Sequence, residues 1–186
     1  MAFRTEGVLV VARHGRSTWN AEGRFQGHGD PPLDAVGRAQ ADALAGALAR
    51  VQAQPAVVVS SDLRRAAETA GAVAVRCGVQ VRTMPELREV DVGAWQGLTV
   101  ADVQERFPQE YAQWAADPGD ATLRRGGGET VAEAGARVAA ALRSIASGWR
   151  YHSVVVVSHG LALQAALRLQ GVDDAPHLEN GAWMQL

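Results

Sequence analysis

Three groups of polar residues in this chain could together bind and transfer a phosphoryl group. Arg13 and His14 follow one aliphatic run, Arg64 and Arg65 lie shortly after a second, and His159 follows a third. An arginine guanidinium can form two parallel hydrogen bonds to phosphate oxygens, and a neutral histidine can attack phosphorus to give a phosphohistidine. Two histidines and at least two arginines in one crevice suit a dianionic phosphate better than other common ligands.

Each of these groups lies at the end of a predicted strand. The runs 8–12, 57–59 and 154–157 are short, rich in valine and bounded by polar residues, which is typical of buried strands in a parallel sheet. Ligands of open α/β sheets bind at the carboxyl ends of the strands. If the three strands are neighbours, the polar residues that follow them meet in one crevice.

The alternation of strands and helices predicts an α/β fold. We expect a three-layer sandwich in which a mostly parallel sheet carries helices on both faces. Asp34 and Thr130 have the side chains that favour helix starts, and Gly78 suits a helix end. The predicted helices are 34–51, 63–78, 130–145 and 161–170, and two further strands are predicted at 79–83 and, on an edge, at 182–186.

The chain is predicted to form one domain over residues 1–186, since its length suits a single α/β core. The segment near 85–128 is less regular and is interpreted as an insertion of short helices that covers the site. Its aromatic residues and the prolines that interrupt it are Trp95, Phe107, Tyr111, Trp114, Pro108 and Pro118.

The composition argues against several classes of protein. The net charge is −2, so the chain lacks the basic excess that general nucleic-acid binding requires. No segment approaches the length of a membrane-spanning helix, and the run 8–12 is too short for a signal-peptide core. Cys77 is the single cysteine and cannot form an internal disulfide. We expect a cytoplasmic protein; a homodimer is compatible with the sequence, which does not specify the oligomeric state.

Hydrolysis of a phosphoester also requires a residue that protonates the leaving group and then removes a proton from water. One carboxylate can do both in turn. Glu89 is the preferred candidate, Asp91 is a weaker one, and Glu86 is expected to face solvent.

Two further groups near the strand ends are expected to contact the phosphate. Main-chain N–H groups at the start of the helix after His159 should face the pocket, where a helix N-terminus favours an anion. One of Arg64 and Arg65 should point into the cleft, and the other should pair with Glu68 at the surface. The helical phase alone does not choose between the two arginines.

In their order and spacing these residues resemble the histidine phosphatase superfamily, in its phosphoglycerate-mutase-like branch. The resemblance spans nearly the whole chain. The stretches that carry it are 13–15 with Ser17, Trp19 and Asn20; 24–27; 61–66; 87–89 with Gly93, Trp95, Gln96 and Gly97; 127–130; and 157–160.

The resemblance implies a role for each predicted catalytic residue. His14 is implied as the phosphorylated nucleophile, with Arg13, Arg65 and His159 around the phosphoryl group. Arg65 is thereby selected over the arginine that precedes it. Glu89 is implied as the proton donor and then the base.

The resemblance also implies a substrate pocket beyond the nucleophile. Asn20 is implied as an accessory residue of the phosphate pocket, and Gln26 and Gly27 as a loop near the substrate. We include Gly160, at the predicted helix N-terminus, among the substrate-binding residues. The family requires no metal and no organic cofactor for this chemistry.

We therefore predict a phosphomonoester hydrolase that acts on a small phosphorylated metabolite through a phosphohistidine. The alternatives are a cofactor-dependent phosphoglycerate mutase, disfavoured by the short insertion, and a non-catalytic phospho-ligand-binding protein, disfavoured by intact His14, Glu89 and His159. A metal hydrolase that also used His28 and Asp30 is disfavoured because two guanidiniums beside a cation would repel it.

Three arginines have no assigned role at this point. Arg16 stands where the family often has Glu or Gln; it is expected to face solvent or pair with an acid, the alternative being contact with a second anionic group of the substrate. Arg124 and Arg125 lie near the end of the inserted segment, where they could bind an acidic substrate or be solvated. The sequence does not specify the physiological substrate.

Overall fold

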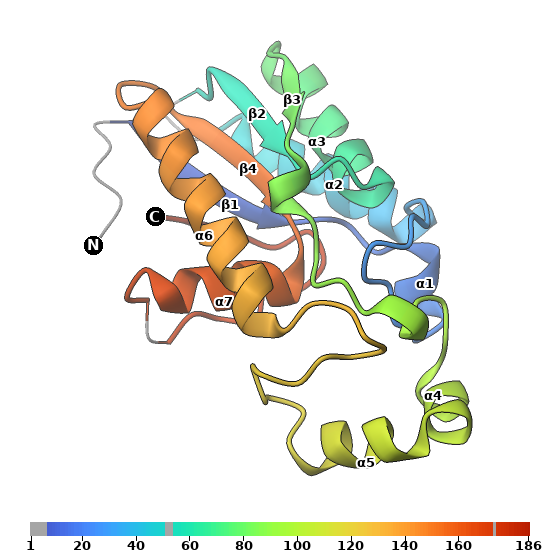
Figure 1. The fold of residues 1–186 in the computed structure, drawn as a ribbon. Coiled ribbons are helices and arrows are strands. Elements are labelled where there is room, and N and C mark those ends of the chain that lie inside the picture. The colour runs from blue at the N-terminus through green and yellow to red at the C-terminus, as the bar shows by residue number, and fades with distance from the viewer. Residues whose placement is uncertain (1–6, 51–53, 173) are drawn as a thin grey trace.

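One sheet holds the molecule together, with strand order β3-β2-β4-β1-β5 (Figure 1). Four strands are parallel, and β5 runs antiparallel to β1 at the edge. Their bounds are β1 (Leu9–Arg13), β2 (Val57–Ser60), β3 (Val81–Thr83), β4 (Val154–Ser158) and β5 (Trp183–Gln185). Because β4 pairs with both β1 and β2, the strands that precede the predicted catalytic residues are neighbours.

Helices cover both faces of the sheet, which confirms the predicted three-layer architecture. Successive strand residues point to opposite faces, so Val154 and Val156 pack on one side and Val155 and Val157 on the other. The helices are α2 (Ala35–Leu48) and α3 (Arg64–Cys77) on one face, and α6 (Val131–Gly148) and α7 (Gly160–Leu169) on the other.

The predicted helix ends have the expected side-chain chemistry. The Asp34 side chain accepts a hydrogen bond from the main-chain N–H of Gly37 and caps α2. Thr130 and Glu133 form a reciprocal capping box at the start of α6. Gly78 has φ +69° and ends α3 in the left-handed conformation.

The segment between β3 and α6 consists of short helices on the side of the sheet to which the parallel strands point (Figure 1). These are η1 (Pro85–Leu87), η2 (Gly93–Trp95), α4 (Val100–Arg106) and α5 (Pro108–Ala116), and α1 (Thr18–Ala21) follows β1. Buried Trp95 packs with Phe25, Tyr111 and Trp114 in a separate small core. Its aromatic residues therefore stabilise the segment itself.

The structure is a computed structural model that describes residues 7–50, 54–172 and 174–186. Val51, the last residue of the predicted helix 34–51, lies outside the described residues. Within the described ranges, no helix has both the length and the apolar content needed to cross a membrane.

Candidate active site

The carboxyl ends of β1, β2 and β4 bring predicted residues into direct contact. His14 follows β1 and His159 follows β4, and their ring centroids are 5.0 Å apart. Arg65 lies in the first turn of α3, just after β2, and its Nε donates to Nε2 of His14 at 3.2 Å. All three side chains are at most 2% exposed. Parallel neighbouring strands therefore place three residues from distant sequence positions against one another.

The His14 ring is set up as a neutral nucleophile. Its Nδ1 lies 2.7 Å from the Gly15 carbonyl oxygen, which places the proton on Nδ1. The Nε2 lone pair then accepts the hydrogen bond from Arg65. Burial, and next the positive charge of Arg65, hold the pKa of His14 well below its usual range. At neutral pH the ring therefore offers an unprotonated Nε2 to an electrophile.

The two adjacent arginines at the start of α3 have different surroundings. Arg64 is exposed, and its Nε donates to Glu68 Oε1 at 2.7 Å, as expected for a surface pair. Arg65 is fully buried and donates to the main-chain oxygens of Gly29 at 2.7 Å and Gly27 at 2.9 Å. Burial lowers the pKa of Arg65 to about 10, so the guanidinium stays charged at neutral pH.

Arg13, the last residue of β1, is held by the segment that precedes β5. Its Nη1 donates to the Leu178 carbonyl oxygen at 2.8 Å and lies 3.0 Å from Nε2 of His177. Its Nε is buried and has no hydrogen-bond partner among the described residues. A Cβ at Gly160 would lie 3.1 Å from the Arg13 guanidinium, so a larger residue there would require the guanidinium to shift. His177 was not predicted from the sequence.

His159 also has an unused donor or acceptor in the pocket. Its Nε2 lies 2.9 Å from the Ser61 hydroxyl, whereas Nδ1 is buried and finds no partner in the described part of the chain. Burial, followed by the charge of Arg65, lowers the pKa of His159 well below its usual range. The Nδ1 of His159 and the Nε of Arg13 are therefore available to oxygens of a bound anion.

Glu89 occupies the N-terminus of α7. Its Oε1 accepts from the main-chain N–H of Ala162 at 2.9 Å and of Val90 at 3.0 Å, and its Oε2 accepts from Leu161 at 3.3 Å. An internal carboxylate thus binds the N–H groups of Leu161 and Ala162. The expectation that this helix N-terminus and Gly160 contact the phosphate stays a prediction. The helix dipole thus fixes Glu89 beside His159, the residue that precedes α7.

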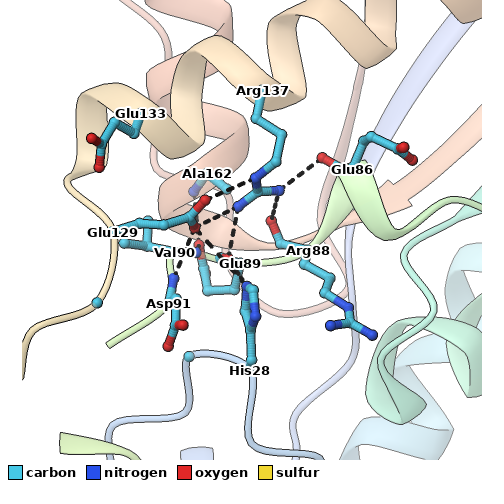
Figure 2. A network of polar contacts seen from close by, with 12 residues as sticks. His28, Glu86, Arg88, Glu89, Val90, Asp91, Glu129, Glu133, Arg137 and Ala162 are labelled. Carbon is cyan, nitrogen blue, oxygen red and sulfur yellow. Dashed lines mark hydrogen bonds and ion pairs between the residues drawn. The ribbon is translucent and has the colours of Figure 1, made fainter. Parts of the chain in front are cut away.

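A second network, shown in Figure 2, fixes the main chain on either side of Glu89. Arg137 of α6 pairs with Glu129 through two contacts, of 2.6 Å and 3.0 Å. Glu129 in turn accepts from the main-chain N–H of Asp91 at 3.0 Å. The remaining Arg137 donors bind three main-chain oxygens, those of Glu86 at 2.8 Å, Arg88 at 3.1 Å and Glu89 at 3.2 Å.

This network was not predicted, although Arg137 lies beside the apolar stripe of α6 that contains Ala134 and Val138. A polar residue at the margin of a buried helix face was the available signal. Glu86 is exposed, as expected. Asp91, the weaker acid candidate, accepts instead from the main-chain N–H of Gly93 at 2.8 Å.

A family model for the histidine phosphatase superfamily (branch 1) matches residues 9–181. The chain belongs to this superfamily. A metal-independent phosphoserine phosphatase of Arabidopsis thaliana is 38% identical over 176 residues, which cover 94% of this chain and 73% of the relative. A glucosyl-3-phosphoglycerate phosphatase of Mycobacterium tuberculosis is 38% identical over 192 residues, which cover 96% of this chain and 84% of the relative.

A solved structure of a mycobacterial glucosyl-3-phosphoglycerate phosphatase in complex with VO3 has the same fold. It superposes with a TM-score of 0.82 at 36% identity and covers 97% of this chain and 90% of that chain. These findings confirm the predicted family, the phosphoglycerate-mutase-like fold and the predicted enzyme class, a phosphatase.

The residues predicted for the pocket of this histidine phosphatase meet around Ser17. Gln26 Oε1 accepts from the Ser17 hydroxyl at 2.6 Å, and Asn20 Oδ1 accepts from its main-chain N–H at 3.1 Å. Gly27 contributes its carbonyl oxygen to Arg65. Asn180 was not predicted, yet its Nδ2 donates to the carbonyl oxygen of His14 at 3.1 Å. These contacts fix the loop that carries the nucleophile.

The residues of the rival metal site have other partners. Nε2 of His28 lies 2.9 Å from the Glu89 carbonyl oxygen, and Oδ1 of Asp30 accepts from the main-chain N–H of Arg64 at 2.5 Å. In the ranges that the structure describes, no three His, Cys, Asp or Glu residues are grouped so as to hold a metal ion.

The remaining arginines differ sharply in environment. Arg16 pairs with Asp34 at 2.7 Å, as one of its two expected arrangements required. Arg124 is exposed and pairs with Glu133. Arg125 is buried, with only 8% of its surface exposed.

Proposed function

We propose that this protein hydrolyses phosphomonoesters of small metabolites in two steps, through a phosphohistidine on His14. The observation that carries the proposal is the His14 ring itself. Its Nδ1 proton is directed to the Gly15 carbonyl oxygen, and its neutral Nε2 faces the Arg65 guanidinium in a buried pocket. A neutral nucleophile beside a fixed cation is what attack on a phosphate dianion requires.

In the first step, Nε2 of His14 attacks phosphorus and the bond from phosphorus to the leaving oxygen breaks. Glu89, in its protonated form, gives its proton to that oxygen. Arg13, Arg65 and His159 face the phosphoryl oxygens and stabilise their charge in the transition state. The products are the free alcohol, the phosphohistidine and the Glu89 carboxylate.

In the second step, the Glu89 carboxylate removes a proton from water as the water oxygen attacks phosphorus. The phosphorus–nitrogen bond breaks, which returns neutral His14 and releases inorganic phosphate. Glu89 is protonated again, so the same carboxylate acts as acid and then as base.

The names of the relatives support a small metabolite as substrate. Phosphoserine and glucosyl-3-phosphoglycerate are both small phosphomonoesters. We place the reaction in the cytoplasm on a free metabolite; this location and a homodimeric state stay predictions.

Trapping the intermediate tests the proposal. Wild-type protein is mixed with less than one equivalent of radiolabelled substrate and quenched with detergent at alkaline pH, because phosphohistidine is labile in acid. We expect label on the peptide that contains His14. His14→Ala should give neither label nor turnover. Release of phosphate by the wild-type protein without any labelled intermediate would instead indicate direct attack by water.

A further inference from the structure

Arg125 is a buried cation without an ion-pair partner among the residues that the structure describes. It is 8% exposed, and its only hydrogen bond to another described residue runs from Nη2 to the Pro118 carbonyl oxygen at 3.2 Å. Its Nε is buried and unpartnered, and it forms no ion pair with any carboxylate that the structure describes. Its neighbour Arg124 is exposed and bound to Glu133 and to the Gly128 carbonyl oxygen.

A buried guanidinium is unfavourable unless a negatively charged group balances it. Removing a guanidinium from water costs several kcal/mol when no counter-ion replaces the solvent. Burial lowers the pKa of Arg125, but an arginine remains protonated at neutral pH. Two further buried side-chain nitrogens without a partner among the described residues, Arg13 Nε and His159 Nδ1, belong to the proposed phosphate pocket.

The loop that carries Arg125 is attached to the segment just after Glu89. The Gly126 carbonyl oxygen accepts from the main-chain N–H of Ala94 at 2.9 Å, and the N–H of Glu129 donates to the Asp91 oxygen at 2.9 Å. Glu89 is also the carboxylate whose negative charge raises the pKa of Arg125 against the effect of burial. The loop contacts and this charge effect together place Arg125 near Glu89.

The position relative to Glu89 indicates which part of a substrate Arg125 meets. In the proposed function Glu89 protonates the leaving oxygen, so groups on its side of the cleft lie next to the alcohol part of the ester. Arg13 and Arg65 lie at the carboxyl ends of β1 and β2, next to the proposed nucleophile His14, whereas Arg125 belongs to the segment between β3 and α6. Arg125 thus faces the portion of the substrate that differs from one phosphomonoester to another.

We propose that Arg125 binds a carboxylate on the alcohol part of the substrate, so that the protein selects phosphomonoesters of hydroxy acids. This inference rests on the proposed function. A planar guanidinium matches the two oxygens of a carboxylate, and a monoanion balances a single cation, whereas a second phosphoryl group would bring two charges. A substrate without that carboxylate leaves Arg125 unpaired in its complex.

The test compares two esters that differ at one group. 3-Phosphoglycerate and glycerol 3-phosphate share the phosphate and the carbon chain, and only the first has a carboxylate. We expect wild-type kcat/KM to favour 3-phosphoglycerate by about 10- to 100-fold, the range of a hydrogen bond to a charged group. Arg125→Met removes the charge at similar length and should bring this ratio close to one, mainly through KM.

Matched variants and a reference substrate define the controls. Arg124→Met should retain the wild-type ratio, because Arg124 is exposed and paired elsewhere. Arg125→Lys keeps the charge but loses the planar fork, so its ratio should be intermediate. The kcat/KM for p-nitrophenyl phosphate, which has no carboxylate, reports the phosphoryl chemistry of each variant.

Several results would overturn the proposal. A wild-type ratio near one does so without any variant, which keeps the test decisive if Arg125→Met does not fold. An unchanged ratio in Arg125→Met does so as well. A changed dependence on leaving-group pKa with an unchanged ratio would mean that Arg125 acts on Glu89 instead of the substrate.

Failure of the proposed function has a separate signature. In that case the wild-type protein hydrolyses neither ester nor p-nitrophenyl phosphate. The ratio of the two dissociation constants, measured by calorimetry, then tests Arg125 by itself: tighter binding of 3-phosphoglycerate that is lost in Arg125→Met supports the carboxylate site, and equal affinities overturn it.

Discussion

The chain contains two Arg-Arg pairs, one just after β2 and one in the segment before α6, and they are built alike. In Arg64-Arg65 and in Arg124-Arg125, the first arginine is exposed and bound to a glutamate, whereas the second is buried. The first pair lies at the end of β2, and the second lies in the irregular segment before α6. Burial of the second arginine alone therefore does not distinguish the two regions.

The difference lies in how firmly the buried guanidinium is held. Arg65 donates to the oxygens of Gly27 and Gly29 and to the His14 ring, whereas in the described part of the chain Arg125 donates only to the Pro118 oxygen. A cation fixed by several acceptors is preorganised for a group that never changes, which here is the phosphoryl group. A buried guanidinium with an unpartnered donor, such as that of Arg125, suits the part of the substrate that differs between phosphomonoesters.

The largest effect should come from Arg65→Ala. Because Arg65 is proposed to contact the phosphoryl group of every substrate, we expect kcat/KM to fall by about 1,000-fold for all phosphomonoesters, as for loss of a fixed donor to a transition state. The kcat/KM values for p-nitrophenyl phosphate and glycerol 3-phosphate measure the loss. A loss of kcat/KM confined to esters with a carboxylate would contradict the distinction between Arg65, proposed to act on all phosphomonoesters, and Arg125.

The next effect concerns the leaving group. Glu89→Gln removes the proton donor, so alkyl esters should lose about 100-fold or more, and aryl esters, whose leaving groups need less protonation, should lose less. A plot of log kcat/KM against leaving-group pKa checks this, and its slope should steepen in the variant. Equal losses for both ester types would count against Glu89 as the acid.

A third prediction concerns stability, and it applies to the strand-end side of the cleft. His14 and His159 have lowered pKa values in the folded state, so below pH about 6.5 the unfolded chain takes up protons that the folded chain does not. The free energy of unfolding should therefore fall with decreasing pH, by up to about 1.4 kcal/mol per pH unit for each histidine.

Urea denaturation between pH 7.5 and 5.5 measures this slope. His159→Asn should reduce it, because one of the two sites is gone. A slope that is identical in the variant would show that the buried histidines do not account for the acid sensitivity.

The smallest effects should come from the exposed members of the two pairs. Arg64→Ala and Arg124→Ala each break a surface ion pair, worth about 1 kcal/mol or less, and should change kcat/KM by no more than about twofold. Thermal denaturation and the two-ester assay check both. A large loss of activity in either variant would remove the distinction between outer and inner arginines.

Much of the strand-end side followed from the sequence because its signals are local. Valine runs located the strands, and the residues immediately after them were placed by the strand direction. The choice of Arg65 over Arg64 came from the family resemblance, and the burial of Arg65 agrees with it.

The contacts of Glu89, Arg137 and Arg125 did not follow from the sequence, because they join residues that no local pattern connects. Glu89 reaches Ala162 at the start of α7, 73 positions along the chain. Arg137 binds main-chain oxygens of the η1 region, about which its own helix gives no information. The burial of Arg125 depends on how an irregular segment folds over the site, where neither helical nor strand periodicity applies.

The capping of α7 by Glu89 has a mechanical consequence for turnover. When this side chain is ionised, its charge faces the positive end of a ten-residue helix; when it carries a proton, that attraction of about 0.3–1 kcal/mol is lost. Each catalytic cycle, as proposed, would switch the cap between a strong and a weak form. His159 immediately precedes that helix. A change in the protonation state of Glu89 would therefore be transmitted through α7 to the His159 ring, which is proposed to face the phosphoryl group.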